Sequence, residues 1–346
     1  MKIASVIASI ALLASSGINA ASNRDYIEIV GSSTVYPFAI AVAERFGKRS
    51  KFKTPKIEST GSGGGLKLFC NGVGVAHPDM TNSSRRIKQK EFEMCQKNGV
   101  TDIIEVLIGF DGIAFANSKK TEQFSLTRRD IYLALAKDIP NPDGSESFIT
   151  NPHVTWNDVN SALPATNIEV LGPPPTSGTR DAFAELALEG GCKSFPWVKA
   201  FKKVDKGAYK ARCHTIREDG PYIEAGENDN LIVNKLNANP SAFGVFGYSF
   251  LDQNTDKVQG SLIEGFEPTF ESIAEGDYSI SRPLYFYVKK AHIGVVPGME
   301  GYLREFTSEA TWGDEGYLTD RGMIPLSIEK RKAIGDAVKN QISLEL

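Results

Sequence analysis

The sequence contains few of the residues from which metal sites and nucleic-acid surfaces are built. Among its 346 residues there are four cysteines without a C-x-x-C pair and four histidines, which are His77, His153, His214 and His292. This scattered spacing is unlike that of a zinc site. Lysine and arginine total 39 and aspartate and glutamate total 42, so the chain lacks the basic excess that binding to DNA or RNA requires. We therefore expect no metal, no cofactor and no nucleic-acid partner.

The chain also lacks a hydrophobic run long enough to cross a bilayer. Its apolar N-terminal segment, Ile3–Leu13, is shorter than the ~20 residues that a membrane-spanning helix needs. The segment follows Lys2 and leads into small and polar residues that end at Ala20, the order of a secretory signal peptide. We predict that residues 1–20 are a signal peptide cleaved near Ala20. Loss of Lys2 changes the formal net charge from −3 to −4, and we expect a soluble, exported protein.

The four cysteines favour disulfide bonds in an exported chain. Secretion to an oxidising compartment makes disulfides the first expectation, and four cysteines allow three pairings. We favour the two local pairs, Cys70 with Cys95 and Cys192 with Cys213. Each bond would restrict the unfolded chain by about 3 kcal/mol.

What the chain does contain is three loops rich in glycine and hydroxyl residues, each leading into a predicted helix. They are Gly31–Thr34, Thr60–Gly65 and Thr176–Arg180. The first turn of a helix has backbone N–H groups without intrahelical partners and the positive end of the helix dipole, so it can bind an anion. Glycine lets the backbone approach closely, and hydroxyls add donors. A single such loop is more simply a helix cap, but three in one chain predict a shared anionic ligand.

The apolar pattern alternates between strand-like and helix-like segments. This alternation predicts an α/β fold with a mostly parallel sheet, and the length predicts two domains. Ligands of such sheets bind beyond the C-terminal ends of the strands, so we expect the three loops to face a cleft between two lobes. The predicted strands are 26–30, 56–59, 103–116, 168–171, 244–248 and 283–289, and the predicted helices are 37–46, 66–69, 88–97, 128–136, 181–188, 229–237 and 328–342.

Five motifs stand in an order that carries a family resemblance. They are Val30–Pro37, Gly61–Gly65, Thr81–Arg85, Thr176–Phe183 and Ala238–Tyr248. Together they resemble the phosphate-binding proteins of bacterial ABC importers, and the resemblance covers nearly all of the mature chain.

The resemblance implies an α/β, two-lobed periplasmic-binding-protein fold with a hinge and an inter-lobe ligand cleft. Lobe 1 would consist of residues 21–108 and 287–346, and lobe 2 of residues 109–286. A member of this family captures inorganic phosphate in the periplasm and delivers it to an inner-membrane ABC permease. We therefore expect a monomer that binds phosphate and is not an enzyme.

The resemblance also implies that phosphate is held by all three loops. Arg180 would supply a fork of N–H donors that fits phosphate bidentately. Some members have an arginine earlier, where this chain has Pro173–Pro175, so Arg180 must take its place. The implied ligands are Ser33, Thr34 and the amide of Val35 from the first loop, Ser62 and Gly63 from the second, Ser84 and Arg85 from the segment after Asn82, and Ser177, Gly178, Thr179 and Arg180 from the third.

Selectivity for phosphate requires a proton acceptor. Phosphate near neutral pH carries at least one proton and sulfate carries none, so a buried acceptor favours phosphate. Some members of the family have an aspartate where this chain has Ser84. Our candidate is Asp111, because a charge inside an otherwise apolar strand needs a reason. A carboxylate that is solvated or paired with an arginine is the alternative, and both interpretations stay open.

Three other functions compete with phosphate delivery. The same loops could bind arsenate, sulfate, molybdate or a phosphonate, and a phosphate-binding protein could act as a scavenger or sensor. A phosphate-ester hydrolase could use Ser33, Ser62 or Ser177 as nucleophile. Catalysis would need a nearby base, which the scattered histidines do not suggest, and the chain has no G-x-S-x-G motif.

Overall fold

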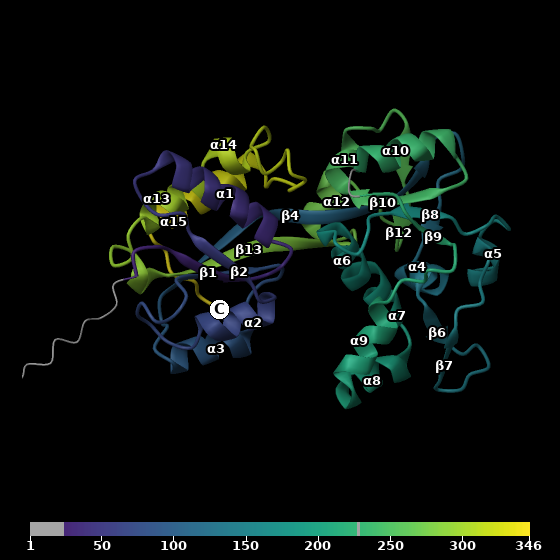
Figure 1. Ribbon diagram of the computed structural model, residues 1–346, viewed down its shortest axis with the longest axis horizontal. Helices are drawn as coiled ribbons and strands as arrows, with labels where there is room; N and C mark the ends of the chain where they lie inside the picture. The colour runs from purple at the N-terminus through teal and green to yellow at the C-terminus, as the bar shows by residue number, and fades with distance from the viewer. Residues whose placement is uncertain (1–23, 227–228) are drawn as a thin grey trace, which may run out of the picture.

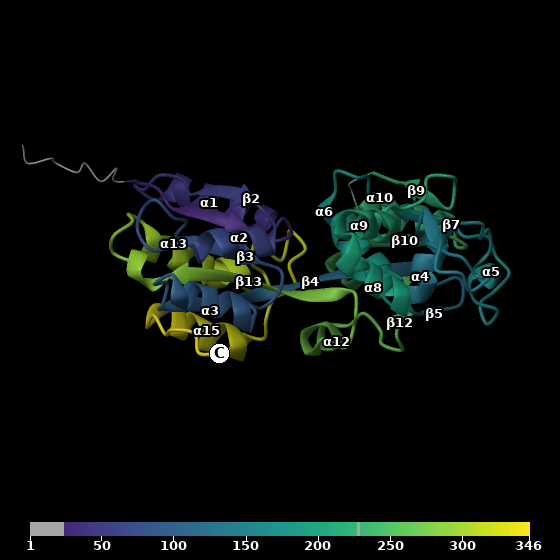
Figure 2. The ribbon, with the colours of Figure 1, turned by 90° about the horizontal axis from the view of Figure 1, so that it is seen from below.

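Two long strands, β4 (Ile103–Ser118) and β13 (Ser281–Lys289), connect two α/β lobes that lie side by side (Figure 1, Figure 2). The computed structural model describes residues 24–226 and 229–346, and the predicted signal peptide, residues 1–20, lies outside them. The first part of β4 pairs antiparallel with β13, and its last part pairs with strands of the second lobe. The connection between the lobes is therefore itself part of the sheet.

The sheet of the first lobe places three parallel strands next to β13. Its order is β2-β1-β3-β13-β4, in which β1 (Glu28–Gly31), β2 (Lys56–Ser59) and β3 (Met80–Ser83) run parallel. The C-terminal ends of these three strands share one edge of the sheet. Each strand leads there into one of the motifs expected to bind an anion.

The helices of the first lobe bury apolar faces against this sheet. In α1 (Tyr36–Arg49), Pro37 stands in the first turn, and Phe38, Val42 and Phe46 recur at helical spacing and are buried. The other helices of this lobe are α2 (Ser62–Phe69), α3 (Gln89–Lys97), a 3-10 helix (Lys290–His292), α13 (Met299–Phe306), α14 (Glu309–Trp312) and α15 (Ile328–Lys339).

The second lobe is built on the far part of β4. There β10 (Phe243–Gly247) and β11 (Val258–Gly260) pair antiparallel with β4, and β8 (Val170–Gly172) pairs parallel with β10 and with β9 (Tyr222–Glu224). The remaining strands are β5 (Ser125–Leu126), β6 (Asp138–Pro140), β7 (Phe148–Thr150) and β12 (Leu262–Ile263). The helices are α4 (Arg128–Leu135), α5 (Trp156–Val159), α6 (Gly178–Phe183), a π-helix (Ala184–Leu188), α7 (Glu189–Cys192), α8 (Pro196–Val204), α9 (Lys206–His214), α10 (Asp229–Ala238), α11 (Tyr248–Asp252) and α12 (Phe270–Glu275).

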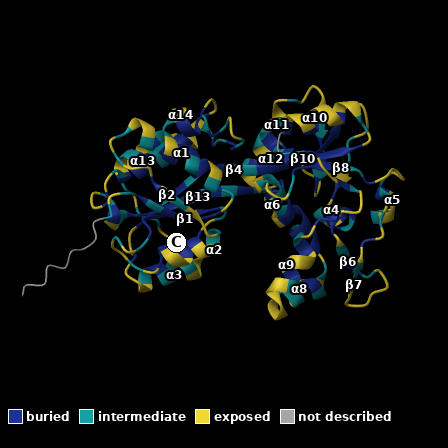
Figure 3. Cartoon of the chain, in the orientation of Figure 1, coloured by how far each residue is buried: buried dark blue, intermediate teal, exposed yellow. Residues whose placement is uncertain are grey.

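The two lobes have separate hydrophobic cores. In the second lobe, the rings of Phe115, Trp156 and Phe243 pack together, with centroids 5.1–6.1 Å apart. In the first lobe, Phe286 of β13 packs against Phe306 of α13. Figure 3 shows β4 buried where it passes from one lobe to the other. Each lobe has its own core, although Ile324 and Leu326 of the C-terminal segment pack against the core of the second lobe. In the described part of the chain only β4, β13 and this segment connect the cores, so we expect the lobes to move as units about the connecting strands.

Both predicted disulfides are confirmed. Cys70 at the end of α2 is bonded to Cys95 in α3, and Cys192 at the end of α7 is bonded to Cys213 in α9. Each bond joins helices of one lobe.

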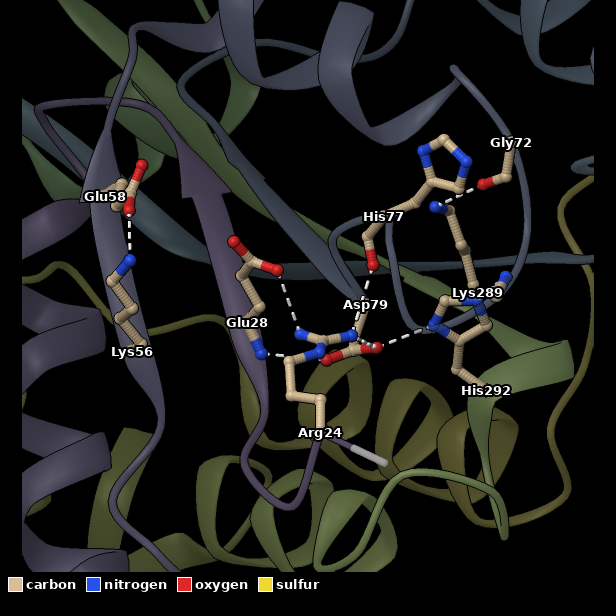
Figure 4. Close-up of polar contacts among 10 residues, drawn as sticks. Arg24, Glu28, Lys56, Glu58, Gly72, His77, Asp79, Lys289 and His292 are labelled. Carbon is tan, nitrogen blue, oxygen red and sulfur yellow. Dashed lines mark hydrogen bonds and ion pairs between the residues drawn. The ribbon is translucent and has the colours of Figure 1, made fainter. Parts of the chain in front are cut away.

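A buried charged network lies at the edge of the first-lobe sheet opposite the motifs expected to bind an anion (Figure 4). Arg24 and His292 both contact the Asp79 carboxylate, at 2.7 and 2.6 Å. The amide of Gly74 donates to Nε2 of His292 (2.8 Å), so the ring carries its proton on Nδ1 and donates it to Asp79. Burial, partly offset by Asp79, lowers the pKa of nearby Lys289 to about 8. This network joins Arg24 and the segment before β3 to the end of β13.

The sheet differs from the prediction in two respects. It is mixed instead of mostly parallel, because β4 and β13 are antiparallel to each other and to their neighbours β10 and β3. The sequence also predicted no strand at Met80–Ser83, yet β3 lies between β1 and β13. Its Met-Thr-Asn-Ser sequence has little apolar character, although all four residues are buried.

The helices differ from the prediction in number as well as in extent, because the sequence did not predict α5, α7, α11, α12, α13 and α14. The helix predicted over 181–188 is α6 followed by a π-helix, and α8 and α9 were not predicted. No helix in the described ranges is both long and apolar enough for a membrane span.

Candidate functional site in the inter-lobe cleft

A cleft of about 890 Å³ lies between the two lobes. The first lobe contributes residues 32–34, 61–63 and 84–85 to its lining, which are the ends of the motifs that follow β1, β2 and β3. The second lobe contributes Arg180 and residues from α6 to α9, and Arg282 of β13 lies between the lobes. The structure thus brings together Ser33, Thr34, Ser62, Gly63, Ser84, Arg85 and Arg180 of the expected ligands.

The first loop is shaped by a close backbone approach. Gly31 has a φ of +130°, and a Cβ there would lie 2.2 Å from the carbonyl oxygen of Asn82. The neighbouring Ser32 is buried, and its Oγ accepts hydrogen bonds from the amides of Thr34 (3.2 Å) and Val35 (3.4 Å). The start of α1 is therefore satisfied by the loop's own serine. Val35 is buried and is not among the residues that line the cleft.

The second loop is joined to the segment after β3. Ser62 accepts a hydrogen bond from the amide of Ser84 (3.0 Å), and the two hydroxyls are 3.2 Å apart. Gly65 packs against Gly31, since a Cβ at position 65 would lie 2.4 Å from the Gly31 Cα. The three first-lobe motifs therefore form one continuous surface of hydroxyl and amide groups.

The third loop caps α6 in the second lobe. The Ser177 Oγ accepts a hydrogen bond from the amide of Thr179 (3.2 Å). Ser177, Gly178 and Thr179 are not among the residues that line the cleft, whereas Arg180 is. Their contact with a ligand stays a prediction.

Each arginine of the cleft is paired with a carboxylate. Arg180 donates to Glu224 (3.0 Å) and stacks over the Tyr222 ring, 4.8 Å from its centroid. Arg85 binds Glu91 bidentately (2.7 and 2.9 Å), and this hydrogen bond raises the pKa of Arg85. The side chain of Arg180 is 11% exposed and that of Arg85 is 32% exposed. An anion in the cleft must therefore share these cations with the carboxylates or replace the carboxylates.

Asp111 lies on β4 directly opposite Arg282 of β13. The Arg282 Nε donates to Asp111 (3.3 Å), and its Nη1 donates to Glu185 (2.7 Å) in the π-helix. Arg282 and Glu185 line the cleft and Asp111 does not. The structure thus contains the arginine-paired arrangement that the sequence left as the alternative for Asp111, and its role as a proton acceptor stays a prediction.

Arg282 and Glu185 were missed in the sequence. Arg282 had a recognisable signal, because it is a cation directly before the largely apolar strand predicted over 283–289, near the expected crossing between the lobes. Glu185 had none. It reaches the cleft through the π-helix that follows α6, a local irregularity common at functional sites that apolar spacing does not reveal.

A second polar cluster lines the far part of the cleft around Glu189. This buried carboxylate accepts hydrogen bonds from Lys202 (2.7 Å) and Tyr209 (3.2 Å) and contacts Lys193 (2.8 Å) and His214 (2.7 Å). Burial opposes its charge, but these partners outweigh burial and lower the pKa of Glu189. His214 is thereby held by the Glu189 carboxylate.

The titratable residues of the cleft do not form a metal-type cluster. Within the described ranges, no group of three or more histidine, cysteine, aspartate or glutamate side chains is arranged to hold a metal ion.

Comparison with known proteins identifies the family. A profile described as the PBP superfamily domain matches residues 18–310, most of the chain. The chain belongs to the PBP superfamily. The chain is 30% identical to Protein SphX of Synechococcus elongatus over 285 residues. The matched region covers 79% of this chain and 72% of that protein.

A second relative and a solved structure agree with this assignment. The PBP protein is 29% identical over 299 residues to the phosphate-binding protein PstS of Staphylococcus saprophyticus, covering 83% of this chain and 78% of that one. The crystal structure of a possible phosphate binding protein from Planctomyces limnophilus shares the fold, with a TM-score of 0.71 at 24% identity, covering 92% and 99% of the two chains. The family resemblance and the two-lobed α/β fold expected from the motifs are confirmed.

Proposed function

We propose that this PBP protein captures inorganic phosphate between its lobes and delivers it to the permease of an ABC importer. The observation that carries the proposal is the composition of the cleft. Hydroxyl and amide donors of the first lobe face it from one side and Arg180 faces it from the other. Donors on both lobes allow an oxyanion to be enclosed when the lobes close, as transport proteins of this architecture require. The relatives named phosphate-binding protein support phosphate as the anion.

The proposed ligands are those that the motifs imply. Ser33, Thr34 and the amide of Val35, together with Ser62, Gly63, Ser84 and Arg85, would bind from the first lobe. Ser177, Gly178, Thr179 and Arg180 would bind from the second lobe after closure. Because the Val35 amide donates to Ser32, phosphate would have to replace the serine hydroxyl there.

The proposal includes the setting in which the protein works. We infer a mature chain that starts near Ala21 and acts as a monomer in the periplasm, without catalytic activity. The proposed lobes are residues 21–108 with 287–346, and residues 109–286. The course of β4 and β13 between two cores supports two lobes of this kind, but Leu284 and Phe286, which this division assigns to the second lobe, pack in the core of the first.

Isothermal titration calorimetry tests the proposal. The protein is unfolded, freed of any carried-over ligand and refolded, and is then titrated with phosphate, arsenate, sulfate and molybdate. We expect tight binding of phosphate, measurable binding of arsenate, which carries the same proton, and no heat from sulfate. Sulfate or molybdate binding as tightly as phosphate would show that the cleft serves another oxyanion.

A further inference from the structure

Helices α8 and α9 form a strongly basic part of an otherwise acidic molecule. Residues 196–214, which we name the cationic arm, have one acidic residue, Asp205, whereas the whole chain has a formal net charge of −3. Figure 1 and Figure 2 show α8 and α9 extending from the second lobe beside the first, and Figure 3 shows that much of their surface is exposed. The basic residues of the arm are Lys199, Lys202, Lys203, Lys206, Lys210 and Arg212.

One side of the cationic arm belongs to the cleft. Lys202, Lys206 and Lys210 line the same cleft as Arg180 and the first-lobe loops. Lys206 and Lys210 also line an adjoining hollow of about 540 Å³ on the arm itself. Both lysines therefore border the cleft and this hollow.

The arm is held firmly against the second lobe. The Cys192–Cys213 disulfide joins it to α7, and Glu189 of α7 binds Lys202 of α8 and His214 of α9. Asp205 caps α9 by accepting from the amide of Ala208 (2.9 Å). The lysines therefore stand on a fixed scaffold.

Lys206 and Lys210 differ from the other cations of the cleft. Arg180, Arg282 and Lys202 each contact a carboxylate. The side chains of Lys206 and Lys210 are exposed and make no ion pair or hydrogen bond with residues 24–226 and 229–346. Their charge is not cancelled by a contacting partner, so it contributes to the potential over the cleft at distances of about a Debye length.

We propose that the cationic arm is an outer anion-collecting site, in which Lys206 and Lys210 attract phosphate dianions and speed their entry into the cleft. This inference rests on the proposed phosphate-binding function. Fixed charges at the mouth of a cleft raise the local concentration of an opposite-charged ligand and its association rate, and salt screens the effect. The two lysines act on the rate of entry, and the loops and Arg180 hold the bound anion.

The test compares association rates of a double variant and a matched control. Lys206→Gln with Lys210→Gln removes the two cleft lysines. Lys199→Gln with Lys203→Gln removes the same charge from the same arm at two exposed positions that do not line the cleft. Stopped-flow tryptophan fluorescence with inorganic phosphate gives the association and dissociation rates at ionic strengths of about 0.01 M and about 0.2 M.

The expected result is a change in the association rate alone. In the first variant the association rate falls about three- to ten-fold at low ionic strength, the dissociation rate stays unchanged, and the difference from wild type shrinks at high ionic strength. The control variant keeps nearly the wild-type rate.

Other outcomes overturn the inference and are distinguishable from failure of the proposed function. Equal slowing in both variants would show an effect of net charge alone, a faster dissociation rate would make the lysines direct ligands, and unchanged rates would remove any role. In each case wild-type protein still binds phosphate. Wild-type protein that does not bind phosphate at all in calorimetry would overturn the proposed function, and this inference with it.

Discussion

At the level of single residues, the cleft contains arginines that already have carboxylate partners. Arg180 is nearly buried against Glu224 and the Tyr222 ring, and Arg85 binds Glu91 at a more exposed position. Breaking a buried cation from its partner is costly unless another anion takes its place. If these residues bind phosphate as proposed, binding exchanges one anion for another.

This difference in burial predicts the order of two alanine variants. Arg180→Ala should weaken phosphate binding by about 10- to 100-fold, the range for loss of a charge-assisted hydrogen bond at a desolvated site. Arg85→Ala should weaken it less, because solvent screens its charge more and Glu91 competes with the ligand through two bonds. Calorimetry measures both affinities.

Glu224→Gln is a matched variant that should change phosphate affinity in the opposite direction. It frees Arg180 from its ion pair, so phosphate affinity should rise.

A larger loss of phosphate affinity from Arg85→Ala than from Arg180→Ala would mean that the ligand lies against the first lobe alone.

The predicted proton acceptor is tested by selectivity. Asp111→Asn should lower the ratio of phosphate to sulfate affinity. The substitution removes the candidate proton acceptor, so phosphate loses a specific contact. It also leaves Arg282 with Glu185 as its remaining carboxylate partner, and the more positive potential near Arg282 favours either anion. The measurement is competitive calorimetry with the two anions. Unchanged phosphate affinity together with unchanged rejection of sulfate would contradict the role of Asp111.

A buried carboxylate away from the cleft predicts a pH effect on stability. Burial raises the pKa of Asp229 to about 6, only partly offset by the hydrogen bond from the Gly247 amide. Between about pH 4 and about pH 6 the native state then binds more protons than the unfolded state, so this group makes the protein less stable as pH rises through that range. At neutral pH the loss is about 3 kcal/mol at most.

Asp229→Asn should therefore stabilise the protein at pH 7 and have little effect near pH 4. The amide keeps an oxygen to accept from Gly247 and has no charge to bury. Urea unfolding at the two pH values measures the difference. A variant that is less stable than wild type at pH 7 would show that the charge is favourable where it lies.

At the level of elements, the proposed anion-binding surface of the first lobe depends on how closely α2 packs against β1. Gly65 makes this approach possible, because an added Cβ would lie 2.4 Å from Gly31 and 2.6 Å from the Thr81 hydroxyl. The neighbouring Gly64 has more room, with its nearest atom at 3.5 Å. The triple glycine thus has a packing role at its last position.

Gly65→Ala should destabilise the protein by about 1–3 kcal/mol, the usual range for overpacking, and weaken phosphate binding because the first two loops move apart. Gly64→Ala is the control and should change stability little or increase it slightly, since alanine favours the helix. Thermal unfolding measures the change in stability, and calorimetry measures the change in phosphate affinity. Equal effects of the two substitutions would mean that α2 can shift away from β1 without cost.

At the level of the whole molecule, two separate cores joined by β4 and β13 predict closure about those strands. A compact chain of this length has a radius of gyration of about 20 Å, and two lobes separated by a cleft exceed it. Phosphate should lower the radius measured by small-angle X-ray scattering toward that value, and Arg180→Ala should reduce the change at equal phosphate. An unchanged radius at saturating phosphate would rule out lobe closure as the means of enclosing the anion.

Local pattern was sufficient to predict several parts of the fold. The apolar spacing of α1 and the long apolar run of β4 identified these elements, and the cysteine spacing together with the export signal identified both disulfides. The loop motifs identified the family and most residues that line the first-lobe side of the cleft. These features depend on neighbours in the chain, so the sequence alone contains them.

Other features were decided only by contacts between distant segments. β3 is a strand because β1 and β13 provide its hydrogen-bond partners, although its own residues are polar. Arg282 lies in the cleft because β13 pairs with β4 across from Asp111, and Lys206 lies there because a disulfide and Glu189 hold α9 beside α7. The amino-acid sequence by itself determined the family, the loops and the disulfides. Only the tertiary structure decided which charges face the cleft and which are neutralised, because a charge takes its partner from whatever segment the fold brings within a few ångströms.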